Sequence, residues 1–382
     1  MRFKNIVRVL LLLTLTITPA PANAQGAAPD DEIASGAVVC APGVYPSAPG
    51  DCLLAGPSAY LTELARLGLT LPPRPLPAYP PDPALTRVPY RYFHVADDTP
   101  ARFYSSLADA QAKSENALTY TPGFVYISYT SMDDSGHYFL SQSGYWLRGD
   151  GNRIGDISKF QGLLFRGTPR VAFGWTFEQI PVKSAPGYNA PDTGQILQPF
   201  TVVQVYRTEM ANEMEWNMIG PDQWVEGRRV ALVTPNPAPP EGASTNRWID
   251  VDLKEQTLAV YDNNQLVYAT AIATGLEPFW TRPGLFQIFE KKETETMRNN
   301  DPSDFYYLEN VPYTMYFDGA RALHGAYWRT RFGYPQSHGC INLSIGDARW
   351  LFDWADVGDW VYVHDPSGQT PTDPALYQGG AY

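Results

Sequence analysis

Basic residues are in short supply in this chain, which has 28 lysines and arginines against 40 aspartates and glutamates. Three of the 28 lie within the first eight residues, so the rest of the chain has 25 basic and 40 acidic residues, a net charge of −15 with histidine neutral. A surface this acidic argues against nucleic acid as a partner and against adhesion to anionic lipid. It favours solubility and leaves the fold open.

Long apolar runs are also missing, apart from Val9–Thr18 near the N-terminus. That run is shorter than the roughly 20 residues that a transmembrane helix needs, which argues against a membrane anchor. It follows the three basic residues and precedes Ala22 and Ala24, small residues at the positions that a signal peptidase reads. Residues 1–24 are therefore predicted to be a signal peptide cleaved before Gln25, and the mature protein to be secreted with no further membrane contact.

Long amphipathic helices are scarce, whereas the chain has 24 tyrosines, 10 tryptophans, 35 prolines and 31 glycines. Short runs of alternating apolar residues, separated by turn residues, indicate a mainly β fold. One helix is expected from Ser344 through Ala355, because a capping-box pattern opens it. At 382 residues, the chain is too long for one ordinary domain and predicts two or three.

Proline-rich and polar stretches divide the chain. Residues 25–85 are predicted to be a lead-in that ends in a proline-rich linker, and residues 237–245 form a second linker. Between them, residues 86–236 contain two similar segments, 145–150 and 216–227, in which a tryptophan-bearing strand precedes a tight turn. This pattern predicts one or two small SH3-like β-barrel modules. Whether they bind a partner or brace the neighbouring domain is left open, because aromatics at strand spacing more often belong to a core.

Residues 246–364 carry the sharpest pattern, and a flexible tail is expected at 365–382. The turn residues Asp262–Asn264 predict a hairpin. The polar run Lys291–Asp304 predicts a long loop, and long ordered loops inside compact domains are often functional lids. Strands are predicted at 248–253, 257–261, 266–272, 284–289, 313–317 and 360–363.

The three cysteines are Cys40, Cys52 and Cys340. Cys40 and Cys52 flank a short loop rich in proline and glycine, and in an exported protein they are predicted to form a disulfide, with two unrelated thiols as the alternative. Such a bridge would contribute on the order of 3 kcal/mol to stability. Cys340 is then left over, and an odd thiol in a secreted protein is either an intermolecular bridge or a reactive nucleophile.

The residues around Cys340 favour a nucleophile. A thiol reacts as the thiolate, so its pKa must be lowered by an imidazole or by local dipoles, and His324 and His338 are the candidates. Neighbouring glycines would let backbone amides approach a substrate carbonyl, and the amides just before and at Cys340 are the natural oxyanion hole. The pattern therefore indicates acyl transfer through a thioester. A zinc site formed by the same three side chains is the alternative, but no H-E-x-x-H run is present, and no metal or cofactor is predicted.

Resemblance to a known family sharpens this interpretation. The run Ser337-His338-Gly339-Cys340-Ile341-Asn342, preceded by His324-Gly325, resembles the signature of the YkuD-type L,D-transpeptidase catalytic domain. The similarity extends over about residues 246 to 364 and includes Thr281–Phe286 and Val311–Phe317. It implies a mainly β, sandwich-like domain with one capped helix.

The resemblance also implies roles for single residues. Cys340 is then the nucleophile and His324 the imidazole that takes and returns its proton, oriented by the backbone carbonyl of Gly325. His338 and Gly339 would shape the oxyanion hole with the Cys340 amide. Outside the reacting groups, Ser337 occupies the Ser/Thr position of the motif, and Asn342 would brace the loop at a position where some members have arginine. The resemblance also implies that Lys291–Tyr307 is a lid and that Tyr306 and Tyr313 form the pocket wall.

The resemblance further implies that the partners are peptidoglycan stem peptides in the extracytoplasmic cell envelope and that carbapenem-type inhibitors acylate Cys340. The implied reaction releases D-alanine from a tetrapeptide stem and forms a 3→3 cross-link to a second stem. Two alternatives stay open. One is an L,D-carboxypeptidase that uses the same cysteine with water as acceptor, and the other is a non-catalytic cell-wall-binding protein.

Overall fold

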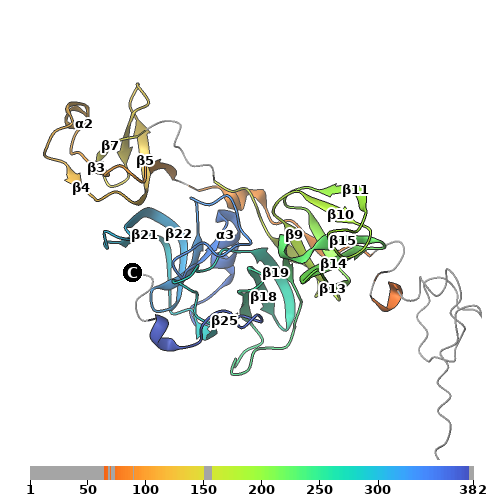
Figure 1. Ribbon diagram of the computed structural model, residues 1–382. Coiled ribbons are helices and arrows are strands. Elements are labelled where there is room, and N and C mark those ends of the chain that lie inside the picture. The colour runs from red at the N-terminus through yellow and green to blue at the C-terminus, as the bar shows by residue number, and fades with distance from the viewer. Residues whose placement is uncertain (1–63, 68, 70–73, 89, 150–156, 378–382) are drawn as a thin grey trace, which may run out of the picture. The chain divides into compact units, whose positions relative to one another are not determined.

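The computed structural model describes residues 64–67, 69, 74–88, 90–149 and 157–377. The predicted signal peptide and the predicted Cys40–Cys52 disulfide lie outside these residues. The described chain is mainly β, as the sequence predicts (Figure 1). In this part of the chain, no helix is both long and apolar enough to cross a membrane.

The first sheet is formed mainly by the predicted strands of the C-terminal third. Strands β18 and β19 form the predicted hairpin, and Asn263 and Asn264 at its turn have φ values of 49° and 60°, as a tight hairpin turn requires. Two short upstream strands, β1 and β8, extend the sheet beyond β19. In spatial order the strands are β1 (Ala78–Tyr79), β8 (Leu163–Phe165), β19 (Gln265–Ala271), β18 (Thr257–Asp262), β17 (Trp248–Asp252), β25 (Trp360–His364) and β20 (Gly284–Gln287).

The second sheet holds the strands that carry the cysteine motif. It too includes upstream strands, because β5 pairs in parallel with β22, with Phe124 opposite Tyr306. Its path is β24 (Ile341–Leu343), β23 (Arg321–Gly325), β22 (Tyr306–Asp318), β5 (Phe124–Met132), β6 (Tyr138–Ser141) and β7 (Trp146–Arg148), with β21 (Glu290–Asn299) beside β22 and β2 (Arg91–Val95) beside β5.

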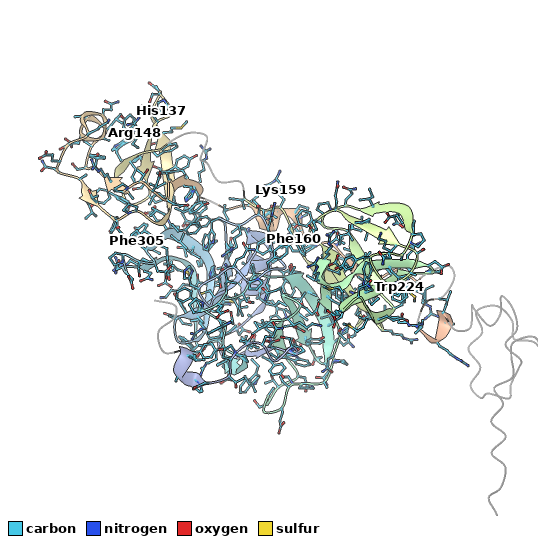
Figure 2. All side chains as sticks on the ribbon, viewed as in Figure 1. His137, Arg148, Lys159, Phe160, Trp224 and Phe305 are labelled. Atoms are coloured by element: carbon cyan, nitrogen blue, oxygen red, sulfur yellow. The ribbon has the colours of Figure 1, made fainter. Side chains whose placement is uncertain are left out.

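The polar run Lys291–Asp304 is not the long loop that the sequence predicts. Most of it is strand β21, which pairs with β22 from Glu290 opposite Tyr316 to Asn299 opposite Tyr306 (Figure 1). The prediction was wrong because charged side chains dominate β21, whose residues are half-buried or exposed and show no clean apolar alternation. At the tip lies Phe305, which is labelled in Figure 2. Its ring stacks with that of Tyr120, and the ring centroids are 5.9 Å apart.

The remaining strands form three smaller sheets, and the α-helix α2 (Leu107–Ala112) lies between two of these short strands in the sequence. The two tryptophan-bearing segments belong to different sheets, 145–150 contributing β7 and 216–227 contributing β14 and β15. The SH3-like modules remain a prediction. The smaller sheets consist of β3 (Arg102–Phe103) and β4 (Leu118–Thr119); of β12 (Val202–Val205), β9 (Ala172–Thr176) and β16 (Val230–Val233); and of β11 (Asp192–Leu197), β10 (Ile180–Lys183), β15 (Gln223–Glu226), β14 (Met214–Gly220) and β13 (Arg207–Ala211).

Helix α3 (Ile345–Trp354) begins where the sequence predicts. Ser344 is its N-cap, and its hydroxyl accepts a hydrogen bond from the Asp347 amide at 3.2 Å. The buried face of α3 packs into an apolar core shared with both sheets. Members of this core include Val251, Leu258, Met315, Leu323, Ile341, Leu343, Ala348, Leu351 and Val361.

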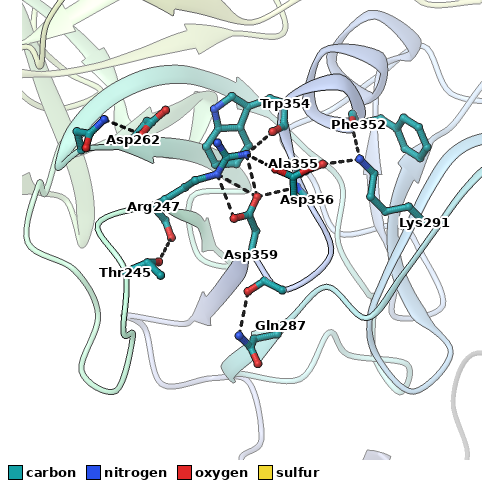
Figure 3. Close-up of polar contacts among 12 residues, drawn as sticks. Thr245, Arg247, Asp262, Gln287, Lys291, Phe352, Trp354, Ala355, Asp356 and Asp359 are labelled. Carbon is teal, nitrogen blue, oxygen red and sulfur yellow. Dashed lines mark hydrogen bonds and ion pairs between the residues drawn. The ribbon is translucent and has the colours of Figure 1, made fainter.

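Cationic side chains hold the C-terminal end of α3 (Figure 3). Lys291 of β21 donates to the Phe352 carbonyl at 2.7 Å and to the Ala355 carbonyl. Arg247 donates to the Trp354 carbonyl and pairs with Asp359, its Nε lying 3.0 Å from Oδ1. Cations at this end satisfy orphan carbonyls and complement the helix dipole. Because α3 follows β24 directly, these contacts also anchor the segment that carries the cysteine motif.

Candidate active site

Two neighbouring parallel strands bring Cys340 and His324 together. His324 lies near the end of β23, and Cys340 immediately precedes β24. The strands pair in parallel with His324 opposite Asn342, which places the cysteine close to the histidine although 16 residues separate them. Both side chains line one cavity of about 340 Å³.

The imidazole of His324 is buried and hydrogen-bonded on both nitrogens. Its Nδ1 lies 3.3 Å from the Gly325 carbonyl oxygen, the contact that the resemblance implies. The Asn342 amide satisfies its partners when its nitrogen donates to His324 Nε2 at 3.0 Å and its oxygen accepts from Arg329 Nε at 2.7 Å. In this arrangement, Nδ1 carries the proton and Nε2 is the basic nitrogen. Taking a proton from Cys340 on Nε2 therefore requires the hydrogen bond from Asn342 to be given up.

The resting pair is neutral, contrary to the expected thiolate. Burial raises the pKa of Cys340 to about 11, against opposing effects of the Ala322 backbone and the Arg321 charge. Burial, together with the positive charge of Arg329, lowers the pKa of His324 to about 4. At neutral pH the side chains are thus a thiol and a neutral imidazole. The proton must move while the sulfur attacks, rather than beforehand.

This neutral pair predicts the pH dependence of alkylation at Cys340 by iodoacetamide. The thiolate fraction rises about tenfold per pH unit below the thiol pKa, so the rate should climb continuously from pH 6 to pH 9. The rate increases with pH over this whole range because the pKa of the thiol is raised rather than lowered. The rate is measured by mass spectrometry of the peptide containing Cys340. A plateau from about pH 5 to pH 8 would instead demonstrate a preformed thiolate–imidazolium pair.

A turn that depends on glycine shapes the backbone just before Cys340. Gly339 has a φ of 111°, a conformation that favours glycine, and a Cβ there would lie 3.2 Å from Arg321 Nε. The Gly339 carbonyl accepts from the Thr281 hydroxyl at 2.9 Å. The Ser337 hydroxyl donates to the Cys340 carbonyl and accepts from the Gly339 amide at 3.2 Å. Of the two amides expected in the oxyanion hole, that of Gly339 is therefore held by Ser337.

His338 is tied to the β21–β22 hairpin. Its Nε2 lies 3.0 Å from Oδ1 of Asp304, a residue of the loop between β21 and β22. Its ring also lies 4.7 Å from Phe279 and 5.5 Å from Tyr306, between ring centroids. His338 lines the cavity, but these contacts suit a residue that joins the loop before Cys340 to the hairpin. Sequence reasoning missed Asp304, because nothing local pairs it with a histidine 34 residues later.

Of the two tyrosines predicted to form the pocket wall, one is found there. Tyr306 lines the cavity, where burial and the nearby Cys340 raise the pKa of its phenol. Tyr313 does not line it, and its ring lies 5.8 Å from that of Phe352 in α3. Both tyrosines belong to β22, but seven residues of extended strand span roughly 23 Å, too far for both to reach one small cavity.

Several cavity residues were not anticipated. Phe124 comes from β5, far upstream of the cysteine motif, and its ring lies 6.5 Å from Trp328 in a T-shaped arrangement. No sequence signal indicated Phe124. Trp328 follows His324 by only four residues, and this closeness could have indicated it as a lining residue. The unanticipated lining residues are Phe124, Met297, Leu308, Trp328, Arg329 and Gln336.

Within the described ranges, no three His, Cys, Asp or Glu side chains are grouped so that they could hold a metal ion. The chemistry that the site offers is that of a thiol beside a buried imidazole, at one end of a mainly apolar cavity. Such a pair is suited to nucleophilic attack on a carbonyl with proton transfer to the imidazole.

The YkuD family model, described as the L,D-transpeptidase catalytic domain, matches residues 246–363. This part of the chain is a YkuD domain. The match covers the strands that carry His324, Cys340 and Asn342, together with α3. No match was found among curated proteins.

The YkuD domain also has relatives among solved structures. An Enterococcus faecium L,D-transpeptidase with a C442S substitution is 27% identical over 31% of this chain and 49% of its own, with a TM-score of 0.29. The Stackebrandtia nassauensis L,D-transpeptidase is 29% identical over 34% and 59%, with a TM-score of 0.27. LdtMt1, solved in complex with imipenem, is 21% identical over 43% and 90%, with a TM-score of 0.30. The chain thus spans about half to three fifths of the first two relatives, and TM-scores this low add nothing to the family match.

Proposed function

We propose that this protein is a peptidoglycan L,D-transpeptidase of the cell envelope, exported by its N-terminal signal. The observation that carries the proposal is the cavity in which Cys340 and His324 meet, within a domain that matches the YkuD family. A thiol nucleophile beside a buried imidazole fits acyl transfer, and the mostly apolar cavity of about 340 Å³ fits a segment of a peptide.

The proposed reaction begins on a tetrapeptide stem. Cys340 Sγ attacks the carbonyl carbon of the L-centre of the third residue, and its proton passes to His324. The bond to the terminal D-alanine then breaks, and the departing amine takes that proton, which leaves a thioester on Cys340. The side-chain amine of a second stem attacks the thioester and gives a proton to His324. The thiol is regenerated when the sulfur leaves and takes this proton, and the product is a 3→3 cross-linked dimer.

Two features of the site support this sequence of steps. The neutral resting pair gives a thiol that is protonated until a substrate arrives, with an imidazole ready to accept the proton. The Cys340 amide would donate to the developing oxyanion, since the Gly339 amide is held by Ser337.

The proposal is tested by incubating the purified mature enzyme with disaccharide-tetrapeptide and separating the products by liquid chromatography and mass spectrometry. We expect D-alanine and 3→3 dimers. Accumulation of tripeptide without dimers would identify an L,D-carboxypeptidase, and an absence of both products would exclude both activities. A carbapenem should give one covalent adduct in the intact mass, located on Cys340 by peptide mapping.

A further inference from the structure

The cavity contains a half-buried cation that the reaction above does not use. Arg329 follows β23 by four residues, and its side chain lines the cavity together with Cys340 and His324. Burial lowers the pKa of its guanidinium to about 10, so the group is still cationic at neutral pH. No aspartate or glutamate is among the described residues that line the cavity, whose other polar members are Tyr306, His324, Gln336, Ser337, His338, Cys340 and Asn342.

The hydrogen-bond partners of Arg329 are all neutral. Its Nε donates to the Asn342 amide oxygen at 2.7 Å, and its Nη1 donates to Oε1 of Gln336 at 2.8 Å. Its Nη2 donates to the Gln336 carbonyl and lies 3.2 Å from the Asn342 oxygen. A guanidinium has five N–H groups, and one on Nη1 has no partner among the residues that the structure describes. The Gln336 side chain is largely exposed and gives way easily to a stronger acceptor.

Other half-buried or buried arginines of the same domain have carboxylate partners. Arg247 pairs with Asp359, while Arg282 and Arg321 both pair with Asp318. This is the usual arrangement, because removing a cation from water is costly unless an anion accompanies it. Within the described chain, Arg329 has no such ion pair. An arginine of this kind beside a nucleophile is suited to an anionic group supplied by the ligand.

We propose that Arg329 binds a carboxylate of the donor peptide and so selects donors that carry one beside the bond to be cleaved. This inference rests on the proposed function. A carboxylate would accept from Nη1 and Nη2 in a bidentate pair, displacing the Gln336 side chain, while Nε keeps its hydrogen bond to Asn342. Two groups of a stem peptide offer this chemistry, the C-terminal carboxylate of the departing D-alanine and a side-chain carboxylate on the third residue.

The test compares three synthetic donors on the full mature chain: a tetrapeptide with both carboxylates, the same peptide with a C-terminal amide, and the same peptide with the third-residue side chain amidated. Each is measured with the unmodified enzyme, with Arg329→Gln, and with Arg331→Gln as control. Arg331 is an exposed arginine two residues further along the same loop and does not line the cavity.

We expect Arg329→Gln to lower kcat/KM for the donor with both carboxylates by about 10- to 100-fold, mainly through KM. One of the two amidated donors lacks the carboxylate that Arg329 binds, and with that donor the unmodified enzyme and Arg329→Gln should have equal kcat/KM. The donor that gives this result identifies which carboxylate Arg329 binds. Arg331→Gln should match the unmodified enzyme on all three donors.

Several results would overturn the inference. An equal loss on all three donors would mean that Arg329 acts only by holding Asn342 against His324. The inference would also be overturned if the unmodified enzyme had the same kcat/KM for all three donors. This measurement does not depend on the folding of any variant. If the unmodified enzyme turns over none of the donors, the proposed function fails and this inference fails with it. If the enzyme is active but does not discriminate among the three donors, this inference fails and the proposed function stands.

Discussion

Replacing Cys340 by alanine is expected to abolish D-alanine release from a tetrapeptide, lowering kcat by at least about 10⁴-fold. The reason is that Cys340 is the only free thiol in the described chain and supplies the sulfur of the proposed thioester. The hydroxyl groups that line the cavity are poor replacements for the sulfur, because that of Ser337 is hydrogen-bonded to the Cys340 carbonyl and the Gly339 amide, and the phenol of Tyr306 has a raised pKa. The loss should therefore be complete rather than partial.

The fold of the Cys340→Ala variant should be unchanged. The residue is half-buried, and its thiol has only weak contacts, a long one to the Ala320 carbonyl at 3.8 Å and one to the Ala322 backbone, so its removal disturbs little. The thermal midpoint should stay within about 2 °C of the unmodified protein, since small changes in such contacts cost a few tenths of a kcal/mol. The carbapenem adduct should disappear at the same time. Undiminished D-alanine release from a correctly folded Cys340→Ala protein would refute the mechanism.

The second large effect concerns stability and centres on Asp347, which is fully buried in the first turn of α3. Its carboxyl group accepts from the hydroxyl of Tyr268 at 2.6 Å and from that of Thr270 at 2.5 Å. It also accepts from the Gly162 amide at 2.8 Å. These bonds tie two segments, strand β19 and the stretch just before β8, to the helix that follows Cys340. Asp347→Ala leaves three buried donors without an acceptor, and we expect the free energy of unfolding to fall by about 3–5 kcal/mol.

The Asp347 effect should also depend on pH. Burial raises the pKa of this carboxyl to about 6, above its unfolded value of 3.8, so the folded state binds the proton more tightly than the unfolded state. Lowering the pH from about 6 towards 4 therefore stabilises the unmodified protein but not Asp347→Ala, and the difference between them should grow. Urea unfolding at pH 7 and pH 5 measures both values.

Asp353→Ala on the same helix is the matched control. The Asp353 side chain is exposed and its closest cation, Arg349, lies 4.0 Å away, so its removal should change stability by no more than about 0.5 kcal/mol. A loss at Asp347 no larger than at Asp353, or one that is the same at both pH values, would contradict the assigned network.

Patterns that are short in sequence predicted much of the YkuD domain. The alternation in 248–253 and 257–261 and the asparagine turn after Asp262 correspond to β17, β18 and the hairpin with β19. The capping box at Ser344 corresponds to the start of α3. Signals of this kind succeed because strand alternation, turn geometry and helix capping depend on residues only a few positions apart.

Where burial from distant segments decides the outcome, the sequence was a poor guide. Lys291–Asp304 reads as a polar loop, but pairing with β22 makes most of it a strand. The thiol of Cys340 was expected to have a lowered pKa, yet the protein around it raises that pKa to about 11. Desolvation is the sum over everything packed around a group, so no local motif contains it.

The sequence by itself identified Cys340 as the candidate nucleophile and His324 and His338 as the candidate imidazoles, because a reactive thiol needs such a neighbour. The choice of His324 between the two rested on the resemblance to the YkuD family. Only the tertiary structure decided what surrounds them. It brought Phe124 from β5 to the cavity through the pairing of β5 with β22, and it placed Arg329 there without a carboxylate partner in the described chain. The type of reactive group can be recognised from a few neighbouring residues, whereas the shape and charge of a cavity arise from contacts between segments that lie far apart in the chain.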